Sequence, residues 1–77
     1  KATHVKIHGS DTGQTFTTYH ANIANKALLK VGNATAIETE LAITNVDSTT
    51  TNFILIEVSS DGTTDEIHGG YMTIALI

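Results

Sequence analysis

The stretch "NFILIEVS", residues 52–59, alternates in a way that leaves apolar side chains on both of its faces. Ile54, Ile56 and Val58 fall on one face, while Phe53 and Leu55 fall on the other. Alternation with a period of two predicts a β-strand, because successive side chains of a strand point to opposite sides. The stretch therefore predicts a strand with no fully polar face.

Similar alternation recurs along the chain between polar turn segments. We expect turns at 9–13, 45–51 and 60–64, and a loop followed by a strand within 21–33. The other predicted strands cover 2–8, 14–20, 35–44, 65–68 and 71–77. Six or seven short strands at intervals of about 8–12 residues are typical of an antiparallel sandwich or barrel. The sequence predicts an all-β fold, a single small antiparallel β-sandwich or barrel, with one β domain over residues 1–77.

The predicted strands differ in how their faces are composed. In 2–8, Thr3, Val5 and Ile7 share one face, and the opposite face is polar. In 35–44, Ile37, Leu41 and Ile43 share a face in the same way. One apolar and one polar face is the pattern of a strand that has water on one side.

Composition narrows the classes of partner. The chain has 77 residues, no cysteine, eight acidic residues and four basic ones, all of them lysines. Without arginine or a basic cluster, a nucleic-acid partner is not expected, and the apolar runs are too short to span a membrane. A domain of this size buries only about 60% of its unfolded surface. With no disulfide available, we expect its stability to come from close packing or from oligomerisation.

Segments 53–58 and 71–77 each carry apolar residues on both faces. A small sandwich has one interior, so a neighbouring subunit or, as an alternative, a loop of the same chain has to cover the second face. We expect Met72, Ile74 and Leu76 to face the chain's own core. The predicted subunit interface of a homo-oligomer consists of Phe53, Leu55, Tyr71 and Ile77.

Asp11, Thr12 and Gly13 form the tripeptide that surrounds the catalytic aspartate of pepsin-like and retroviral proteases. In those enzymes an apolar strand leads directly into the tripeptide, whereas "HGS" precedes Asp11 here. Gly9, Asp11 and Gly13 instead have the chemistry of a hairpin turn. We interpret Asp11 as a turn residue, predict no catalytic residues, and expect no enzyme.

No metal or cofactor site is predicted from the remaining titratable residues. His4 and His8 share a strand face but lie about 13 Å apart along it, too far to bind one ion. Asp61, Asp65 and Glu66 lack the spacing of a calcium loop. Glu38 and Glu40 lie about 6.6 Å apart on one predicted strand face, a separation compatible with a glycosidase pair, but outward strand positions are usually solvated. The default for His4, His8, His20 and His68 is a surface or interface position.

Residues 38–77 combine an apolar alternating strand, an "ITN" step into a Thr/Ser-rich connection, a second apolar strand and a "DGT" turn. This arrangement resembles small β-sandwich proteins of tailed bacteriophage particles, which decorate capsids or attach near tails. The resemblance implies a non-enzymatic structural subunit of a virion, such as a capsid decoration or cement protein. It also implies symmetric homo-oligomers that bury surface between capsid units.

Two alternatives remain open at this point. One is a subunit of an extracellular or cell-surface fibre or pilus, which would be favoured if residues 1–8 were unpaired in their own chain and inserted into the next. The other is an oligomeric sugar-binding module. That alternative is weakened because the chain has no tryptophan and four aromatic residues.

Overall fold

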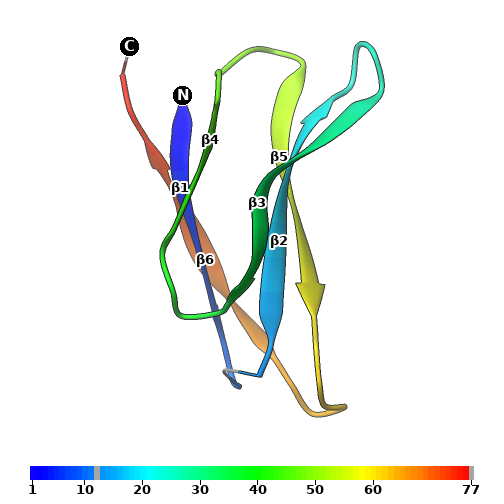
Figure 1. Cartoon of the computed structure of the whole chain (residues 1–77), viewed down its shortest axis with the longest axis vertical. Helices are drawn as coiled ribbons and strands as arrows, with labels where there is room; N and C mark the ends of the chain where they lie inside the picture. The colour runs from blue at the N-terminus through cyan, green and yellow to red at the C-terminus, as the bar shows by residue number, and fades with distance from the viewer. Residues whose placement is uncertain (12, 77) are drawn as a thin grey trace.

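The computed structural model describes residues 1–11 and 13–76, and within them it contains six strands and no helix (Figure 1). No element of this described part could therefore cross a membrane as a helix. The strands are β1 (Ala2–Gly9), β2 (Thr15–Asn22), β3 (Ala27–Ala36), β4 (Leu41–Val46), β5 (Asn52–Ser59) and β6 (Ile67–Ile74). The predicted all-β class and the predicted number of strands are confirmed.

The strands form two three-stranded antiparallel sheets that make a small β-sandwich. One sheet has the order β4-β1-β6 and is called the β1 sheet; the other has the order β3-β2-β5 and is called the β2 sheet. Figure 1 shows the β1 sheet on the left and the β2 sheet on the right. The central strands β1 and β2 have a neighbour on each side, whereas β3, β4, β5 and β6 each have one free edge within the chain.

The core lies between the two sheets and is richest around β1, β2 and β4. Phe16 and Ile37 are fully buried at its centre, and Gln14 and Thr18 are buried with them. Apolar residues from every strand except β6 contribute: Ala2, Val5, Phe16, Val31, Ile37, Ile43 and Val46 form the buried cluster, with Ile7, Leu41, Ile54, Ile56 and Val58 packed against it. The inner face predicted for segment 52–59 is thus confirmed, since its even-numbered residues point to the core.

A β-bulge changes the inward face of β1. The register of β1 with both of its neighbours shifts between Ala2 and His4. As a result Ala2 is buried in the core next to Val5, whereas we expected Thr3 to occupy that face. A bulge inserts one extra residue and reverses the alternation beyond it, which strict period-two reasoning does not anticipate.

The prediction of one strand over 35–44 is wrong. β3 ends at Ala36, the chain turns, and β4 begins at Leu41 in the opposite sheet. Glu38 has a φ of 67°, and its N–H donates to the Ile7 carbonyl at 2.8 Å. Ile37 is buried just before the turn. The turn contains no Gly, Pro or Asn, so its sequence lacks the usual signal.

The predicted strands 65–68 and 71–77 are instead a single strand, β6, which ends at Ile74. It runs through Gly69 and Gly70, the two residues that separate the predicted strands. A Cβ at Gly70 would lie 2.3 Å from the Lys6 carbonyl oxygen, so glycine is needed for the close approach of β6 to β1. Leu76, expected in the core, lies beyond the strand and is 97% exposed.

Candidate assembly surface

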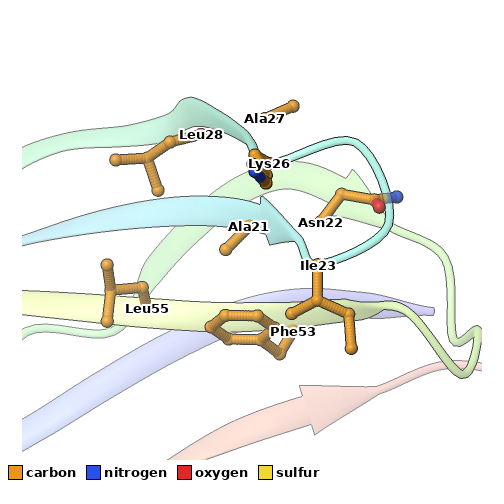
Figure 2. Close-up of a pocket in the computed structure, with 8 residues that line it drawn as sticks. All are labelled: Ala21, Asn22, Ile23, Lys26, Ala27, Leu28, Phe53 and Leu55. Atoms are coloured by element: carbon orange, nitrogen blue, oxygen red, sulfur yellow. The ribbon is translucent and has the colours of Figure 1, made fainter.

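The outer face of the β2 sheet carries a group of apolar side chains at one end of the sandwich, and all but one of them are exposed. We call this group the apolar patch; its members are Ala21, Ile23, Leu28, Phe53 and Leu55. Figure 2 shows them on three neighbouring strands and on the turn that follows β2. Phe53 is 45% exposed and Leu55 is 43% exposed. The patch therefore places large apolar groups in contact with water.

Strand pairing explains why these residues gather. Phe53 lies opposite Ala21 on β2, and Ala21 lies opposite Leu28 on β3. Directly opposed residues share a face of the sheet, so the three side chains form a row across the sheet. Ala21 is buried although it belongs to the outer face and not to the core cluster. Its larger neighbours in the row thus cover it.

The turn that carries Ile23 is fixed by asparagines at the ends of β2 and β5. Asn22 Nδ2 donates to Asn52 Oδ1 at 2.8 Å, and Asn22 Oδ1 accepts the N–H of Ala24 at 2.9 Å. Asn25 Oδ1 accepts the N–H of Ala27 at 2.9 Å as β3 begins. These bonds hold residues 23–26 in a tight turn, and the exposure of Ile23 is a defined feature of the surface.

Polar groups border the patch on its remaining side. Tyr19 lies opposite both Lys30 and Leu55, so the three share the outer face. The Tyr19 hydroxyl donates to Glu57 Oε1 at 3.4 Å. An apolar centre with a polar rim is the usual composition of a protein–protein contact surface.

A second exposed apolar region lies where the sandwich is open between β5 and β6. Met72 and Ile74 lie opposite Val5 and Ala2 in the β1 sheet and so share the inner face with core residues. The expectation that they face the core is met in direction, but they are 43% and 52% exposed. Together with Ile54 of β5 they line a groove between the sheets, which we call the inter-sheet groove.

Tyr71 does not accompany Phe53 and Leu55. It lies opposite Lys6, on the outer face of the β1 sheet, and its hydroxyl donates to Glu40 Oε2 at 2.5 Å. This hydrogen bond raises the pKa of Tyr71 above its ordinary value. The predicted grouping of Tyr71 with Phe53 and Leu55 in one contact is therefore not found. Ile77, the fourth predicted interface residue, lies outside the described residues.

Glu38 and Glu40 belong to the turn between β3 and β4 and have separate partners. Glu38 Oε2 lies 2.8 Å from His8 Nδ1, and its Oε1 accepts the Gly9 N–H at 3.0 Å. The contact with His8, and then that with Gly9, lowers the pKa of Glu38. Both carboxylates thus hold the turn against the β1 sheet, and the strand-face geometry considered for a glycosidase pair does not exist.

The structure brings Asp11 together with Asp61 and Asp65 at the end of the sandwich opposite the apolar patch (Figure 1). Each offers one carboxylate oxygen, and these lie within 4.8 Å of one another. The neighbouring Asp65, and then Asp11, raise the pKa of Asp61. A hydrogen bond from Ser60 lowers the pKa of Asp65. Sequence reasoning missed this cluster, because fifty residues separate Asp11 from Asp61.

These carboxylates also make hydrogen bonds within their own loops. Asp11 Oδ1 accepts the Gly13 N–H at 2.9 Å, as expected of a turn residue. Asp65 Oδ2 accepts Ser60 Oγ at 2.6 Å and the Gly62 N–H at 3.0 Å. Glu66, which the sequence placed beside Asp61 and Asp65, is not part of the cluster; its Oε1 lies 3.6 Å from His68 Nε2. Asp11 and Asp61 are exposed and Asp65 is half-buried, and the hydrogen bonds of Asp11 and Asp65 shape two loops.

The other two histidines occupy different environments. His4 lies on the outer face of β1, with Nδ1 2.9 Å from Thr3 Oγ1. His20 lies in β2 opposite Ile54, and its Nε2 is buried without a hydrogen-bond partner, as is Thr18 Oγ1. Neither histidine belongs to the groups of potential metal ligands found among residues 1–11 and 13–76.

Sequence reasoning identified Phe53 and Leu55 but missed Ile23 and Leu28. The apolar run "ALLKV", residues 27–31, could have indicated Leu28. If 21–33 is interpreted as a turn followed by a strand, pairing of that strand with β2 places Leu28 on the same face as Ala21. Comparisons of the chain with protein-family models, with curated proteins and with solved structures found no match.

Proposed function

We propose that this chain is a non-enzymatic structural subunit of a larger protein assembly, acting by homo-oligomerisation and by burial of apolar surface. The observation that carries the proposal is the exposure of Phe53 and Leu55 on a strand whose other face already packs on the core. Exposed apolar patches of this kind mark sites of protein association. A chain of 77 residues without cysteine also gains the stability that a second subunit supplies.

We further propose a virion as the assembly, with the chain as a decoration or cement protein. This step is supported by the resemblance of residues 38–77 to small β-sandwich proteins of bacteriophage particles. These residues include β4, β5 and β6, and they supply Phe53 and Leu55 of the apolar patch and Ile54, Met72 and Ile74 of the inter-sheet groove. The segment that carries the resemblance thus contributes to both exposed apolar regions.

The absence of enzymatic function in this proposal is supported by the roles of the acidic residues. Glu38, Glu40 and Asp11 make hydrogen bonds that hold turns and loops. Asp61 has a raised pKa, a property of some catalytic carboxyls, but it lies on an exposed loop.

The strand-donation alternative would be favoured if residues 1–8 were unpaired in their own chain, and they are not. β1, which includes most of residues 1–8, is the central strand of its sheet and pairs with both β4 and β6 of the same chain. Strand donation would require an element that leaves its own sheet incomplete. The sugar-binding alternative needs a platform of exposed aromatic residues. Phe16 is fully buried, and the two exposed aromatics Phe53 and Tyr71 lie on the outer faces of different sheets.

The test of the proposed function is the mass of the wild-type chain in solution over a dilution series, measured by light scattering and native mass spectrometry. We expect an oligomer of defined stoichiometry at micromolar concentration, with dissociation on dilution. A monomer at every concentration up to the millimolar range would contradict the proposal. Hydrolysis of a peptide or glycoside substrate by the purified chain would contradict the non-enzymatic part.

A further inference from the structure

The backbone of β5 has a free edge whose hydrogen-bonding groups can be assigned. The Ile23 N–H donates to the Thr51 carbonyl at 3.0 Å, and β2 pairs with β5 without a register shift from Thr15–Ser59 to Asn22–Asn52. In an antiparallel ladder, pairs that exchange hydrogen bonds alternate with pairs that do not. Since 23 and 51 are a bonded pair, the odd-numbered residues of β5 bond to β2.

The even-numbered residues of β5 therefore direct their N–H and C=O groups away from β2. Asn52 confirms this assignment, because its N–H donates to Thr49 Oγ1 at 3.1 Å rather than to β2. Ile54, Ile56 and Val58 follow in the same orientation, and β5 has no second neighbouring strand among the described residues. The backbone N–H and C=O groups of these three residues thus point toward the free edge of the sheet.

The four edge strands of the sandwich are not equally protected against pairing. β3 has two register shifts with its neighbour and carries Lys30, and β4 has six residues. β6 contains Gly69 with a φ of 129° and has register shifts against β1. β5 has eight residues in regular register and a single charge, that of Glu57. Proteins usually blunt exposed edges with bulges, lysines or short strands, so β5 is the edge that is suited to pairing.

We propose that β5 pairs antiparallel with β5 of a second copy of this chain, about a two-fold axis at Leu55. The inference rests on the proposed function and names the contact through which the subunits associate. The two β2 sheets then form one six-stranded sheet with the order β3-β2-β5-β5-β2-β3. A two-fold contact suits this edge because an antiparallel ladder is complementary to itself.

The axis at Leu55 follows from face and charge. In a continuous sheet, outer-facing residues lie opposite outer-facing residues. The outer-facing residues of β5 are odd-numbered, so odd-numbered residues must pair with odd-numbered ones. This requires the two-fold axis to pass between two copies of the same residue. An axis at Glu57 would oppose two like charges, which is destabilising. With the axis at Leu55, each Glu57 lies opposite the partner's Phe53, and the two Glu57 residues are about 14 Å apart.

This one contact buries part of each exposed apolar region along the β5 edge. On the outer face, Leu55 meets the partner's Leu55, and Phe53 lies diagonal to it. On the inner face, Ile54 meets the partner's Ile56. The partner's β5 also lies next to Ile54, which lines the inter-sheet groove together with the exposed Met72 and Ile74.

Hydrogen exchange of individual amides, measured by NMR, tests the proposal. In the wild-type oligomer we expect the amides of Ile54, Ile56 and Val58 to exchange at least about a hundredfold more slowly than in the monomer obtained by dilution. The amides of Leu55 and Glu57 bond to β2 in both states, so they serve as internal controls. Equal exchange of the Ile54, Ile56 and Val58 amides in oligomer and monomer would overturn the edge pairing.

Single-cysteine variants give a second test, because the natural chain contains no cysteine. In the proposed ladder the two Leu55 residues form a pair without mutual hydrogen bonds, with Cα atoms about 4.5 Å apart, within disulfide range. Leu55→Cys should therefore form a covalent dimer on mild oxidation. Leu28→Cys is the matched control: its two copies lie on the far edges, more than about 20 Å apart, and should not cross-link.

The outcomes separate this inference from the proposed function. An oligomer in which Leu28→Cys cross-links as readily as Leu55→Cys means that the apolar patches stack face to face; the edge pairing is then wrong, and the proposed function stands. An oligomer in which Leu55→Cys does not cross-link also overturns the edge pairing alone. A wild-type monomer at every concentration overturns both.

Discussion

β1 and β5 are both eight-residue strands with alternating sequences, yet they differ in their pairing and in the side chains of their outer faces. β1 is the central strand of its sheet, and its outer face carries His4, Lys6 and His8. Neighbouring groups engage part of this face, for example Glu38 with His8. Both edges of β1 are paired, and its apolar side chains are covered by the core.

β5 reverses each of these properties. It has a single neighbouring strand, and its outer face carries Phe53 and Leu55 where β1 carries histidines and a lysine. An edge strand is the position at which natural sheets usually place charge. Apolar residues on both faces of a free edge are the basis of our proposal that β5 forms a contact, whereas β1 is paired on both sides within its own chain.

The largest effect on stability is expected from a charge placed on the inner face of β5. Ile56→Glu places a charge against the core cluster, which Ile56 contacts, and should lower the free energy of unfolding by more than about 3 kcal/mol. Lys6→Glu on the outer face of β1 should leave the fold intact. Circular dichroism and thermal unfolding compare the two variants, and an Ile56→Glu protein with the wild-type melting temperature would contradict the assignment of faces.

A moderate effect is expected from truncation of an outer apolar side chain. Phe53→Ala should raise the dissociation constant of the oligomer by about tenfold or more. Tyr71→Ala should leave it unchanged, because Tyr71 lies on the outer face of the other sheet and bonds to Glu40. Sedimentation equilibrium measures both. Equal weakening by the two substitutions would mean that Tyr71 also belongs to the contact.

A smaller, pH-dependent effect is expected at Glu38. Since the folded state lowers the pKa of Glu38 through His8 and Gly9, its contribution is present above the ordinary glutamate value, about 4.3, and is lost as the pH falls through the lowered pKa. Glu38→Gln should lower the melting temperature at pH 6 by no more than about 3 °C. The difference from wild type should shrink as the pH falls through the lowered pKa of Glu38. A difference that stays constant with pH would contradict the role of the charge.

The opposite sign is expected at Asp61. Neighbouring carboxylates raise its folded-state pKa, so its contribution to stability is present at low pH and is lost as the pH rises through that value. Asp61→Asn should therefore slightly raise the melting temperature at pH 7 and have no effect near pH 3. Glu66→Gln, outside the cluster, is the control for removal of one negative charge. A lower melting temperature of Asp61→Asn at pH 7 would contradict the repulsion.

The smallest effect is expected from metal removal. Because Asp11 and Asp65 already accept hydrogen bonds within their loops, chelator or added calcium should shift the melting temperature by no more than about 1 °C. Asp11→Asn should fold and assemble as the wild type does, since Asn also caps a turn. A large loss of stability in chelator, restored by calcium, would show that the three aspartates bind an ion.

Alternation of side chains was sufficient to predict the all-β class, the number of strands and the inner face of β5. It was not sufficient where the chain departs from regular pairing. The turn at Glu38 was missed because a hydrogen-bond network with His8 and Gly9, and not a turn sequence, supports its positive φ. The bulge near Thr3 and the continuous path of β6 through Gly70 likewise depend on contacts with neighbouring strands.

The same limit applies to the candidate surface. Phe53 and Leu55 were predictable from a single strand, because their exposure depends on the alternation within 52–59. The contributions of Ile23 and Leu28 depend on which strands pair, and the separation of Tyr71 depends on which sheet β6 joins. Residues that only the topology brings together, such as Asp11 and Asp61, give no signal in the sequence.

The mass of the Leu55→Glu variant tests the central claim most directly. Leu55 is on the outer face of β5 and outside the core cluster, so a charge there should separate the subunits while the β-sandwich is retained. Thr44→Glu is the matched control, because Thr44 is exposed on β4 in the other sheet. By light scattering with circular dichroism, we expect Leu55→Glu to be a folded monomer and Thr44→Glu to keep the wild-type oligomeric mass. A Leu55→Glu protein with the oligomeric mass of the wild type would contradict the account.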